Sequence, residues 1–366
     1  MKLTERIRAV LTCALVLGLL AAFPLVKLRT PDQEISAAER RKLAQLPEMT
    51  ADAVFSGRYF QDLETYSLEQ FPFRDSFRAG KALLNTAVFQ RLDNNGYYLL
   101  NGSLCKLDDP LNEKQVLLGA KKLNSLRDRW FPDSRCFYGI IPSKNDYAGA
   151  QNGYPIIGCA EIARLMQEHV TGMEYLDLYP ALSLEDYYRT DTHWRQERLD
   201  GVLEVLGGGI GISFSPLSAY KANTISGFRG VYAGQSALPA EGEDLIYLTS
   251  PLTEKSRVWN AESGSPAAVY QPEKFTGIDP YDVFLSGAVS LLEIDTGENN
   301  GRELIFFRDS FGSSLAPLLL SGYSKVTLVD LRYISSESLG ESIDFHGQDV
   351  LFLYSTGVLN SSAMLR

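Results

Sequence analysis

Apolar strand-like runs that alternate with helical segments fill the last third of the chain. Residues 303–308 (ELIFFR) lead into a helical run over 311–322, and residues 325–331 (KVTLVDL) and 350–357 (VLFLYSTG) follow. Strands that are apolar at nearly every position are covered on both faces, and alternation with helices is typical of a parallel sheet. The pattern predicts an α/β fold with a mainly parallel, doubly covered sheet.

The preceding part of the chain extends this prediction. Residues 114–130 and 161–170 have helical patterns, residues 136–144 form a short apolar strand, and residues 94–103 indicate a hairpin with an Asn-Gly turn. Residues 212–275 lack periodicity and predict short strands joined by long loops, whereas residues 336–344 are expected to be helical.

The first hundred residues divide differently. Residues 30–50 are polar and helix-prone, and residues 51–92 predict two amphipathic helices broken at Pro72. We therefore expect three parts: a membrane anchor over 1–29, a helical stalk over 30–95 packed on the main domain, and the main domain over 96–366.

The N-terminus predicts a membrane anchor. Residues Ala9 to Val26 carry no charged side chain, and as a helix they would span roughly 27 Å, close to the thickness of bilayer hydrocarbon. Lys2, Arg6 and Arg8 precede this run and favour a cytoplasmic N-terminus. A cleaved signal peptide is the alternative, but no small-x-small cleavage pattern precedes Lys27.

Composition removes several classes of function. The formal net charge is −10 and basic residues form no stripe, so nucleic-acid binding is not expected. The chain has four cysteines, and those at 105, 136 and 159 lack the spacing of a zinc site. We expect three buried thiols, with a Cys136–Cys159 bridge as the alternative. No metal or cofactor motif is present.

Among the three histidines, His193 is the candidate for chemistry. It lies in Thr190-Asp191-Thr192-His193-Trp194, on a loop before a helical segment. An Asp two residues from a His can orient the imidazole or stabilise its protonated form. The alternative is structural: Asp191 or Thr192 caps a helix while Trp194 packs beneath it.

Ser310 is the candidate nucleophile. It stands in Asp309-Ser310-Phe311-Gly312, where an apolar strand meets a helix, so its hydroxyl would lie at the carboxyl end of the sheet. Backbone N–H groups at the start of that helix could stabilise an oxyanion. Helix capping is again the alternative. Ser310, His193 and Asp191 together supply a nucleophile, a base and an orienting acid.

At these residues the chain resembles the DHHW family, which is related to the SGNH-hydrolase-like domains of the alginate O-acetylation proteins AlgJ and AlgX. The resemblance rests on Asp-Thr-His-Trp at 191–194 and Asp-Ser-Phe-Gly at 309–312. Further segments that fit the family pattern are Glu39–Leu43, Phe71–Asp75, Pro142–Lys144, Gly227–Gly230, Tyr281–Leu285 and Val329–Tyr333.

The resemblance implies a three-layer α/β/α sandwich with Ser310 as nucleophile, His193 as base and Asp191 as its orienter. It also implies a single-pass membrane protein whose extracytoplasmic domain acts in O-acetylation of a cell-envelope polysaccharide. The partners would be that polysaccharide, as acceptor, and a membrane-bound O-acyltransferase (MBOAT) that delivers acetyl groups.

Four further residues are expected to contact substrate: Tyr188, Trp194, Gly287 and Asp309. The chain departs from the family at Thr192, where the family has His, and at Ala288, where the family tends to have a polar residue after Gly. If that polar residue donates to the oxyanion, its loss costs about 10²–10³ in rate. A carbohydrate esterase with the same triad and a non-catalytic scaffold or glycan-binding protein remain the alternatives.

Overall fold

The computed structural model describes residues 3–108 and 110–366 and is built around one large mixed sheet. Its eight strands run in the order β10-β9-β11-β13-β12-β14-β5-β6. Their bounds are β5 Cys136–Ile141, β6 Glu174–Leu176, β9 Arg257–Asn260, β10 Ser265–Ala267, β11 Leu291–Asp295, β12 Glu303–Arg308, β13 Lys325–Val329 and β14 Asp349–Ser355.

Five neighbouring strands of this sheet are parallel. β12 pairs in parallel with β13 on one side and with β14 on the other, and β14, β5 and β6 continue in parallel. β11, β9 and β10 extend the other edge in antiparallel fashion. The sequence prediction of a mainly parallel sheet is confirmed. β12 lies in the middle of the sheet between β13 and β14, the two strands that follow it in the chain. In open α/β sheets, ligands bind at the carboxyl ends of the strands where the strand order reverses.

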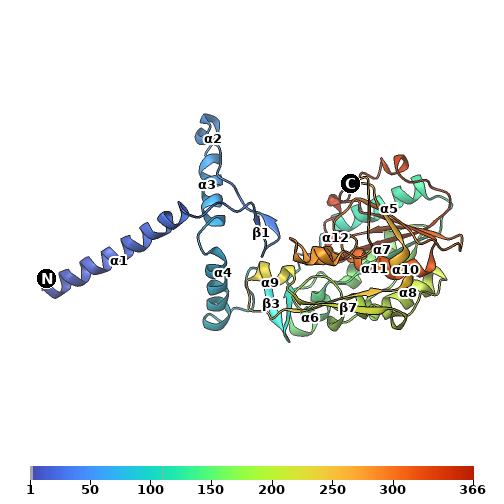
Figure 1. Cartoon of the computed structure of the whole chain (residues 1–366), viewed down its shortest axis with the longest axis horizontal. Helices are drawn as coiled ribbons and strands as arrows, with labels where there is room; N and C mark the ends of the chain where they lie inside the picture. Colours follow the sequence, from blue (N-terminus) through green and yellow to red (C-terminus); the bar gives the residue numbers. More distant parts are fainter. Residues whose placement is uncertain (1–2, 109) are drawn as a thin grey trace. The chain divides into compact units, whose positions relative to one another are not determined.

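Alternation along the strands divides the interior into two cores. In β14, Leu351 and Leu353 face one core while Val350, Phe352 and Tyr354 face the other. α5 (Glu113–Trp130), α7 (Cys159–His169) and α12 (Thr356–Leu359) cover one face, whereas α8 (Asp200–Ile210) and α11 (Phe311–Leu319) cover the other (Figure 1). The expected α/β/α layering is therefore confirmed.

Most of the predicted local elements are present. The hairpin is β3 (Tyr97–Leu100) with β4 (Ser103–Lys106), and its turn residues Asn101 and Gly102 both have positive φ, as a two-residue hairpin turn requires. Residues 212–275 include a longer hairpin than expected, β7 (Lys221–Phe228) with β8 (Glu243–Thr249), and α10 (Pro251–Lys255). The helix expected over 336–344 is wrong: only a 3₁₀ turn, Leu339–Glu341, forms there.

The cysteines of the main domain are three buried thiols. Cys105, Cys136 and Cys159 are all unpaired and buried, whereas Cys13 is exposed. Burial raises the pKa of the Cys136 thiol to about 11, so this side chain behaves as a small hydrophobic residue.

The chain divides into two compact units. The first contains residues up to Asn94 together with Gly234–Pro239, and the second contains Asn95–Ala233 and Ala240–Arg366. The first unit holds α1 (Leu3–Lys27), α2 (Ala51–Phe55), α3 (Arg58–Glu69), α4 (Arg74–Leu83) and a π-helical turn, Leu84–Val88. The helix break expected at Pro72 is present, since α3 and α4 end and begin on either side of it.

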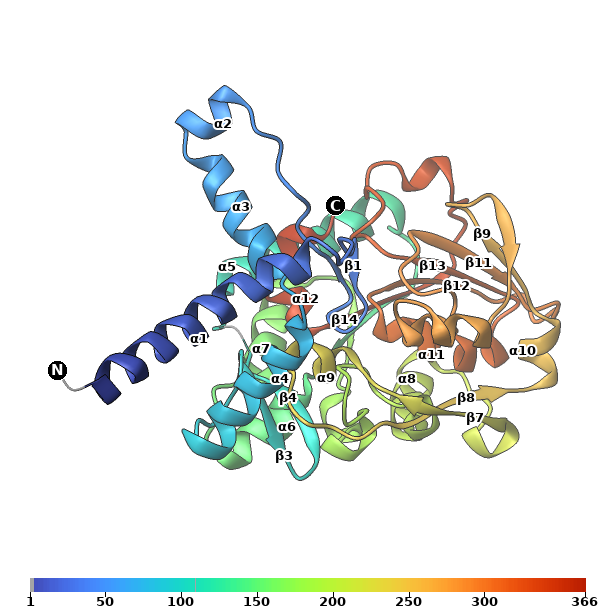
Figure 2. The ribbon, with the colours of Figure 1, turned by 60° about the vertical axis from the view of Figure 1, so that its left-hand side comes forward.

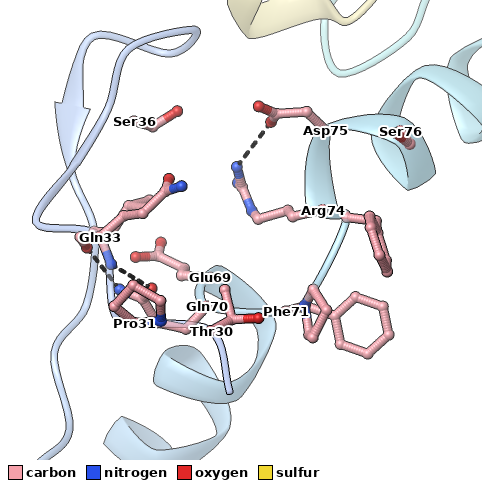
Figure 3. A pocket seen from close by; sticks show the side chains of 13 residues that line it. Thr30, Pro31, Gln33, Ser36, Glu69, Gln70, Phe71, Arg74, Asp75 and Ser76 are labelled. Atoms are coloured by element: carbon pink, nitrogen blue, oxygen red, sulfur yellow. Dashed lines mark hydrogen bonds and ion pairs between the residues drawn. The ribbon is translucent and has the colours of Figure 1, made fainter. Parts of the chain in front are cut away.

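The helix-prone segment 30–50 is not helical. It forms a short hairpin whose two strands, β1 (Ile35–Ser36) and β2 (Arg41–Lys42), have two residues each, and it is otherwise irregular. The end of α3 holds it extended: Gln70 accepts from the Gln33 N–H and donates back to the Gln33 carbonyl, as Figure 3 shows. Glu69 accepts from Arg41 and from the Ala44 N–H. These contacts satisfy backbone groups that a helix would have satisfied internally.

Candidate active site

Ser310 stands between β12 and α11, as the sequence predicts. It is the N-cap residue of α11 and is half-buried, so its hydroxyl lies at the carboxyl end of the central strand. The preceding Asp309 fixes this turn, because its two carboxylate oxygens accept from the N–H groups of Phe311 (3.1 Å) and Ser355 (2.8 Å). The turn is thereby tied to the end of β14.

The early amides of α11 are already engaged. Phe311 and Gly312 donate to the side chain and the carbonyl of Asp309, and Ser313 donates to the Ser310 carbonyl. These three N–H groups therefore have acceptors before any substrate binds. In this conformation these three N–H groups are therefore not positioned to donate to an oxyanion, which was the role expected for amides at this helix start.

His193 and Asp191 share one short loop. The His193 carbonyl accepts from the Tyr188 N–H, which closes the loop on itself. One oxygen of Asp191 accepts from the His193 N–H (3.1 Å) and from His193 Nδ1 (2.6 Å). Its other oxygen accepts from the Val231 N–H (2.8 Å). Asp191 is fully buried, so its charge is held by these donors and not by solvent.

The loop brings the imidazole to the serine. His193 Nε2 lies 2.8 Å from Ser310 Oγ, although the two residues are 117 positions apart in the chain. With its proton on Nδ1, His193 donates to Asp191 and accepts from the Ser310 hydroxyl. An imidazole in this position is able to remove the hydroxyl proton as the oxygen attacks an acyl group.

A flat aromatic contact fixes the plane of the imidazole. The ring of Tyr281 stacks on His193 with centroids 3.8 Å apart and an interplanar angle of 7°. Phe311 approaches the imidazole at 4.9 Å. The Tyr281 hydroxyl donates to Ser314 Oγ, which also accepts from the indole of Trp194. Sequence reasoning missed this role, because nothing local links Tyr281 to a loop 88 residues earlier.

A buried lysine lies beneath the same loop. Lys144 donates to the carbonyls of Tyr188 (2.7 Å) and Asp191 (3.1 Å), and to that of Leu104 on β4 (2.5 Å). Burial lowers its pKa to about 8. The sequence placed Lys144 only within a family-like segment. The structure gives it the role of joining the Asp191 loop to β4.

All four expected substrate contacts are buried. Tyr188 and Trp194 are fully buried, and Asp309 is 1% exposed with both oxygens engaged. Their side chains therefore pack and hydrogen-bond inside the protein and offer no surface to a sugar in this conformation. Gly287 lies in a turn at φ +79°, where its N–H donates to the Phe284 carbonyl.

The Gly287 turn is attached to a buried arginine. Leu285 and Ser286 also have positive φ, which is uncommon for residues with a side chain. Arg308, fully buried just before Asp309, points its guanidinium at the carbonyls of Gly287 (3.4 Å) and Val289 (3.5 Å). Burial lowers its pKa, and the nearby Asp330 carboxylate opposes that shift. Ala288 is exposed.

The remaining histidines lie apart from this constellation. His169 ends α7, with Nδ1 2.9 Å from the Leu165 carbonyl, and His346 lies beside Glu303. Among the described residues, no group of three or more His, Cys, Asp or Glu side chains is arranged to hold a metal ion.

The fold and this arrangement define a three-layer α/β/α protein in which Ser310, His193 and Asp191 are hydrogen-bonded in series. No protein family and no curated protein matches the chain at the level of sequence. Solved structures do match its fold. One is a DHHW family protein from Eubacterium siraeum, at 18% identity and a TM-score of 0.58, which aligns over 74% of this chain and 96% of its own.

Two further solved proteins match the chain structurally. PatB1 of Bacillus cereus, also solved with a sulfonyl adduct, is 17% identical with a TM-score of 0.56, over 72% of this chain and 96% of its own. The O-acetyltransferase domain of Pseudomonas putida AlgJ is more distant, at 12% identity and a TM-score of 0.42, over 72% of this chain and 92% of that domain. The structural relationship to the DHHW group that the motifs indicated is confirmed.

Proposed function

We propose that the protein is a membrane-anchored O-acetyltransferase that acts on a cell-envelope polysaccharide through an acyl-Ser310 intermediate. The observation that carries this proposal is the hydrogen-bonded series Ser310 Oγ–His193 Nε2 (2.8 Å) and His193 Nδ1–Asp191 (2.6 Å). Both contacts have the lengths that proton transfer and imidazolium stabilisation need.

The reaction has two halves. Ser310 Oγ attacks the carbonyl carbon of an acetyl ester while His193 Nε2 takes the hydroxyl proton, and Asp191 stabilises the imidazolium. His193 then gives the proton to the departing donor oxygen, which leaves acetyl-Ser310. In the second half an acceptor hydroxyl loses its proton to His193 and attacks the acetyl carbon, and that proton returns to Ser310.

We infer the identity of the acyl group and of the glycan acceptor from two observations. Residues 191–194 and 309–312 resemble the DHHW family, and a solved DHHW protein shares the fold. α1 supports a membrane-delivered donor, since an anchored site would stay where an MBOAT partner releases acetyl groups. In this proposal α1 spans the cell membrane once, with the α/β domain outside the cytoplasm.

A carbohydrate esterase is the second candidate. Ser310 is half-buried and not sealed from solvent, so water is able to act as the acceptor. Hydrolysis and transfer share the acyl-serine intermediate, and they differ only in what discharges it.

The test separates these functions on one protein. The full chain is treated with 4-nitrophenyl acetate, and acetylated peptides are identified by mass spectrometry, with a sulfonyl fluoride as an independent probe. We expect acetyl on Ser310, none in Ser310→Ala, and unchanged labelling in Ser313→Ala, because Ser313 is the neighbouring buried serine.

Discharge of acetyl-Ser310 then decides the acceptor. We expect the ester to persist in water and to discharge when an oligosaccharide of the right class is added. Rapid discharge in water, unaffected by any glycan, would identify an esterase. Absence of any label on a folded protein would instead favour the non-catalytic scaffold.

A further inference from the structure

Helix α4 turns its polar side inward. Arg74 pairs with Glu39 (2.7 Å), and Arg78 donates to the carbonyls of Gly234 (2.9 Å) and Gln235 (3.0 Å), all within the first unit. Farther along the same side, Asn85 donates to the Asn94 side chain and Ala82 is fully buried. Figure 3 shows the start of α4, where Arg74 reaches toward Asp75. The side that packs within its own unit is therefore the charged one.

An adjoining side of α4, together with its N-cap and the π-helical turn after it, is apolar and exposed. Phe73 at the N-cap, Phe77 on α4, and Leu84 and Val88 in the π-helical turn are 67%, 52%, 52% and 62% exposed. Phe77 and Leu84 are seven residues apart, so at 3.6 residues per turn they point within about 20° of one another. An ordinary surface helix buries such a stripe and exposes its charges. α4 instead packs Arg74 and Arg78 against its own unit and leaves this stripe exposed, so the stripe is available to something other than that unit.

Exposed apolar side chains are concentrated in this unit. Large apolar side chains left in water forgo the free energy of burial, and contiguous exposed patches mark interaction sites. Beyond α1, the first unit exposes Leu28, Ile35, Leu46, Met49, Phe55, Phe60, Leu68, Phe73, Phe77, Leu83, Leu84, Val88, Phe89 and Leu92. The larger second unit exposes half as many, scattered over seven positions.

The first unit also contains the candidate membrane span. Residues Glu5–Lys27 of α1 form a helix long and apolar enough to cross a bilayer. Its end is tied to α3: Lys27 pairs with Asp32, whose carboxylate accepts from the Tyr66 hydroxyl. α1 meets the α3–α4 pair at this junction (Figures 1 and 2). The stripe begins at Phe73, seven residues after Tyr66, within roughly 10–20 Å of the end of the span.

We propose that the apolar stripe of α4, its N-cap and its π-helical turn (Phe73, Phe77, Leu84 and Val88) lies in the interface of the same bilayer that α1 crosses. This inference rests on the membrane anchor of the proposed function. Amphipathic helices with Phe and Leu on one face settle at this depth, where burial of apolar area supplies the binding energy. The second contact would hold the first unit against the membrane, which the single helix α1 alone does not do.

The test measures the depth of α4 in membranes with the full chain. In a Cys13→Ser background the remaining cysteines are buried, so an introduced cysteine takes an environment-sensitive NBD label selectively. Val88→Cys places the label on the stripe. Ala79→Cys is the matched control, because it is exposed on α4 but points about 160° away from Phe77 of the stripe. Both are reconstituted in phosphatidylcholine–phosphatidylglycerol vesicles.

We expect nitroxide-labelled lipids to quench the Val88 label at least about twofold more than the Ala79 label, with the reverse order for aqueous iodide. Equal quenching of both labels by iodide, in a protein that floats with the vesicles, would overturn the stripe inference alone. A Val88 label shielded from both quenchers and cross-linked to a second copy would overturn it in favour of a protein interface. If the protein does not float with the vesicles, the membrane anchor is overturned as well. Acylation of Ser310, measured in the same sample, tests the catalytic proposal independently.

Discussion

At the scale of single residues, the candidate site depends on contacts that hold an imidazole in one plane. His193 has a hydrogen bond at each ring nitrogen, and the face of Tyr281 lies 3.8 Å from its ring. Hydrogen bonds fix where the ring nitrogens point, and stacking restrains rotation of the ring about that line. An aromatic face also stabilises a cation, such as the imidazolium that would form in the proposed reaction.

Tyr281 is therefore expected to act as a positioning residue. Tyr281→Leu removes the flat contact and should lower kcat about tenfold, corresponding to the ~1–2 kcal/mol of a buried cation–π contact, with KM little changed. Tyr281→Phe keeps the ring and loses only the bond to Ser314, so it should retain most activity. Steady-state kinetics on an activated ester checks both. An equal loss in the Phe and Leu variants would show that the hydroxyl, and not the stacked face, is what matters.

Lys144 gives a stability prediction with a definite sign. Its pKa in the folded protein, about 8, lies below the ordinary 10.5, so between these values the unfolded chain holds a proton that the folded chain does not. Unfolding takes up that proton, and raising the pH in this window therefore opposes unfolding. Relative to Lys144→Met, the free energy of unfolding of the natural protein should rise by roughly 1–2 kcal/mol between pH 8 and about 9.5.

Urea unfolding of both proteins across this range measures the difference. Lys144→Met leaves the carbonyls of Leu104, Tyr188 and Asp191 short of a donor, so it should be less stable at every pH. Parallel stability curves for the two proteins would mean that Lys144 does not titrate in this window.

Sequence reasoning reached some of these residues and not others. Asp191 and His193 are two positions apart and Ser310 follows a strand, so local patterns were enough to select them. Tyr281 and Lys144 come from elements far along the chain, and only the folded sheet brings them to the same loop. Tyr188, Trp194 and Asp309 were selected because they neighbour the site in sequence, a criterion that does not register whether a side chain points outward or inward.

At the scale of elements, the start of α9 (Val231–Ser236) sets the place of Asp191. The Gly230 N–H donates to Thr190 Oγ1, and the Val231 N–H donates to the Asp191 carboxylate. A β-carbon at Gly230 would overlap the side chain of Asp191 and the carbonyl of Thr190. The glycine is needed here for close approach of two backbones.

Gly230→Ala should therefore push Asp191 away from His193. We expect activity to fall about 10–100-fold, as small misplacements of catalytic groups do, and stability to fall by about 1–3 kcal/mol. Gly208→Ala, in α8 with open space at the β-carbon, is the matched control and should stabilise by about 0.5–1 kcal/mol. Thermal unfolding and ester turnover measure both effects. Full activity in Gly230→Ala would show that the loop adjusts without cost.

Elements were predictable where their own sequence decides them. The strand over 303–308 and the helix over 114–130 carry unbroken apolar patterns, and both are present. β9 and β10 are only four and three residues long. β9 pairs with β11 and β10 pairs with β9, so both depend on strand pairing and no local pattern identifies them. The helix propensity of residues 30–50 is overridden by the side chains of Glu69 and Gln70, which arrive from α3.

At the scale of the whole molecule, the division into units does not follow the chain in order. Residues 234–239 belong to the first unit, although residues on either side belong to the second. Arg78 and Asn94 hold this insertion by donating to the carbonyls of Gly234 and Ser236. Carbonyl acceptors leave no signature in side-chain patterns, which is why the sequence predicted a continuous domain from residue 96 onward.

α1 is either an uncleaved membrane anchor or a cleaved signal sequence. Within Glu5–Lys27 the mean hydropathy of an 18-residue window reaches 2.5, and none of the described side chains in that window is buried by the protein. Its end is bonded to the first unit through Lys27 and Asp32, a contact that cleavage near residue 27 would remove. We expect the full chain to stay in the membrane pellet after a carbonate wash, with α1 peptides detected by mass spectrometry. Replacing Leu15 and Leu17 by Arg, at a cost of roughly 2.5–3.5 kcal/mol each near the helix centre, should release the protein, whereas Cys13→Ser should not. A soluble product that begins near residue 27 would show instead that α1 is a signal sequence.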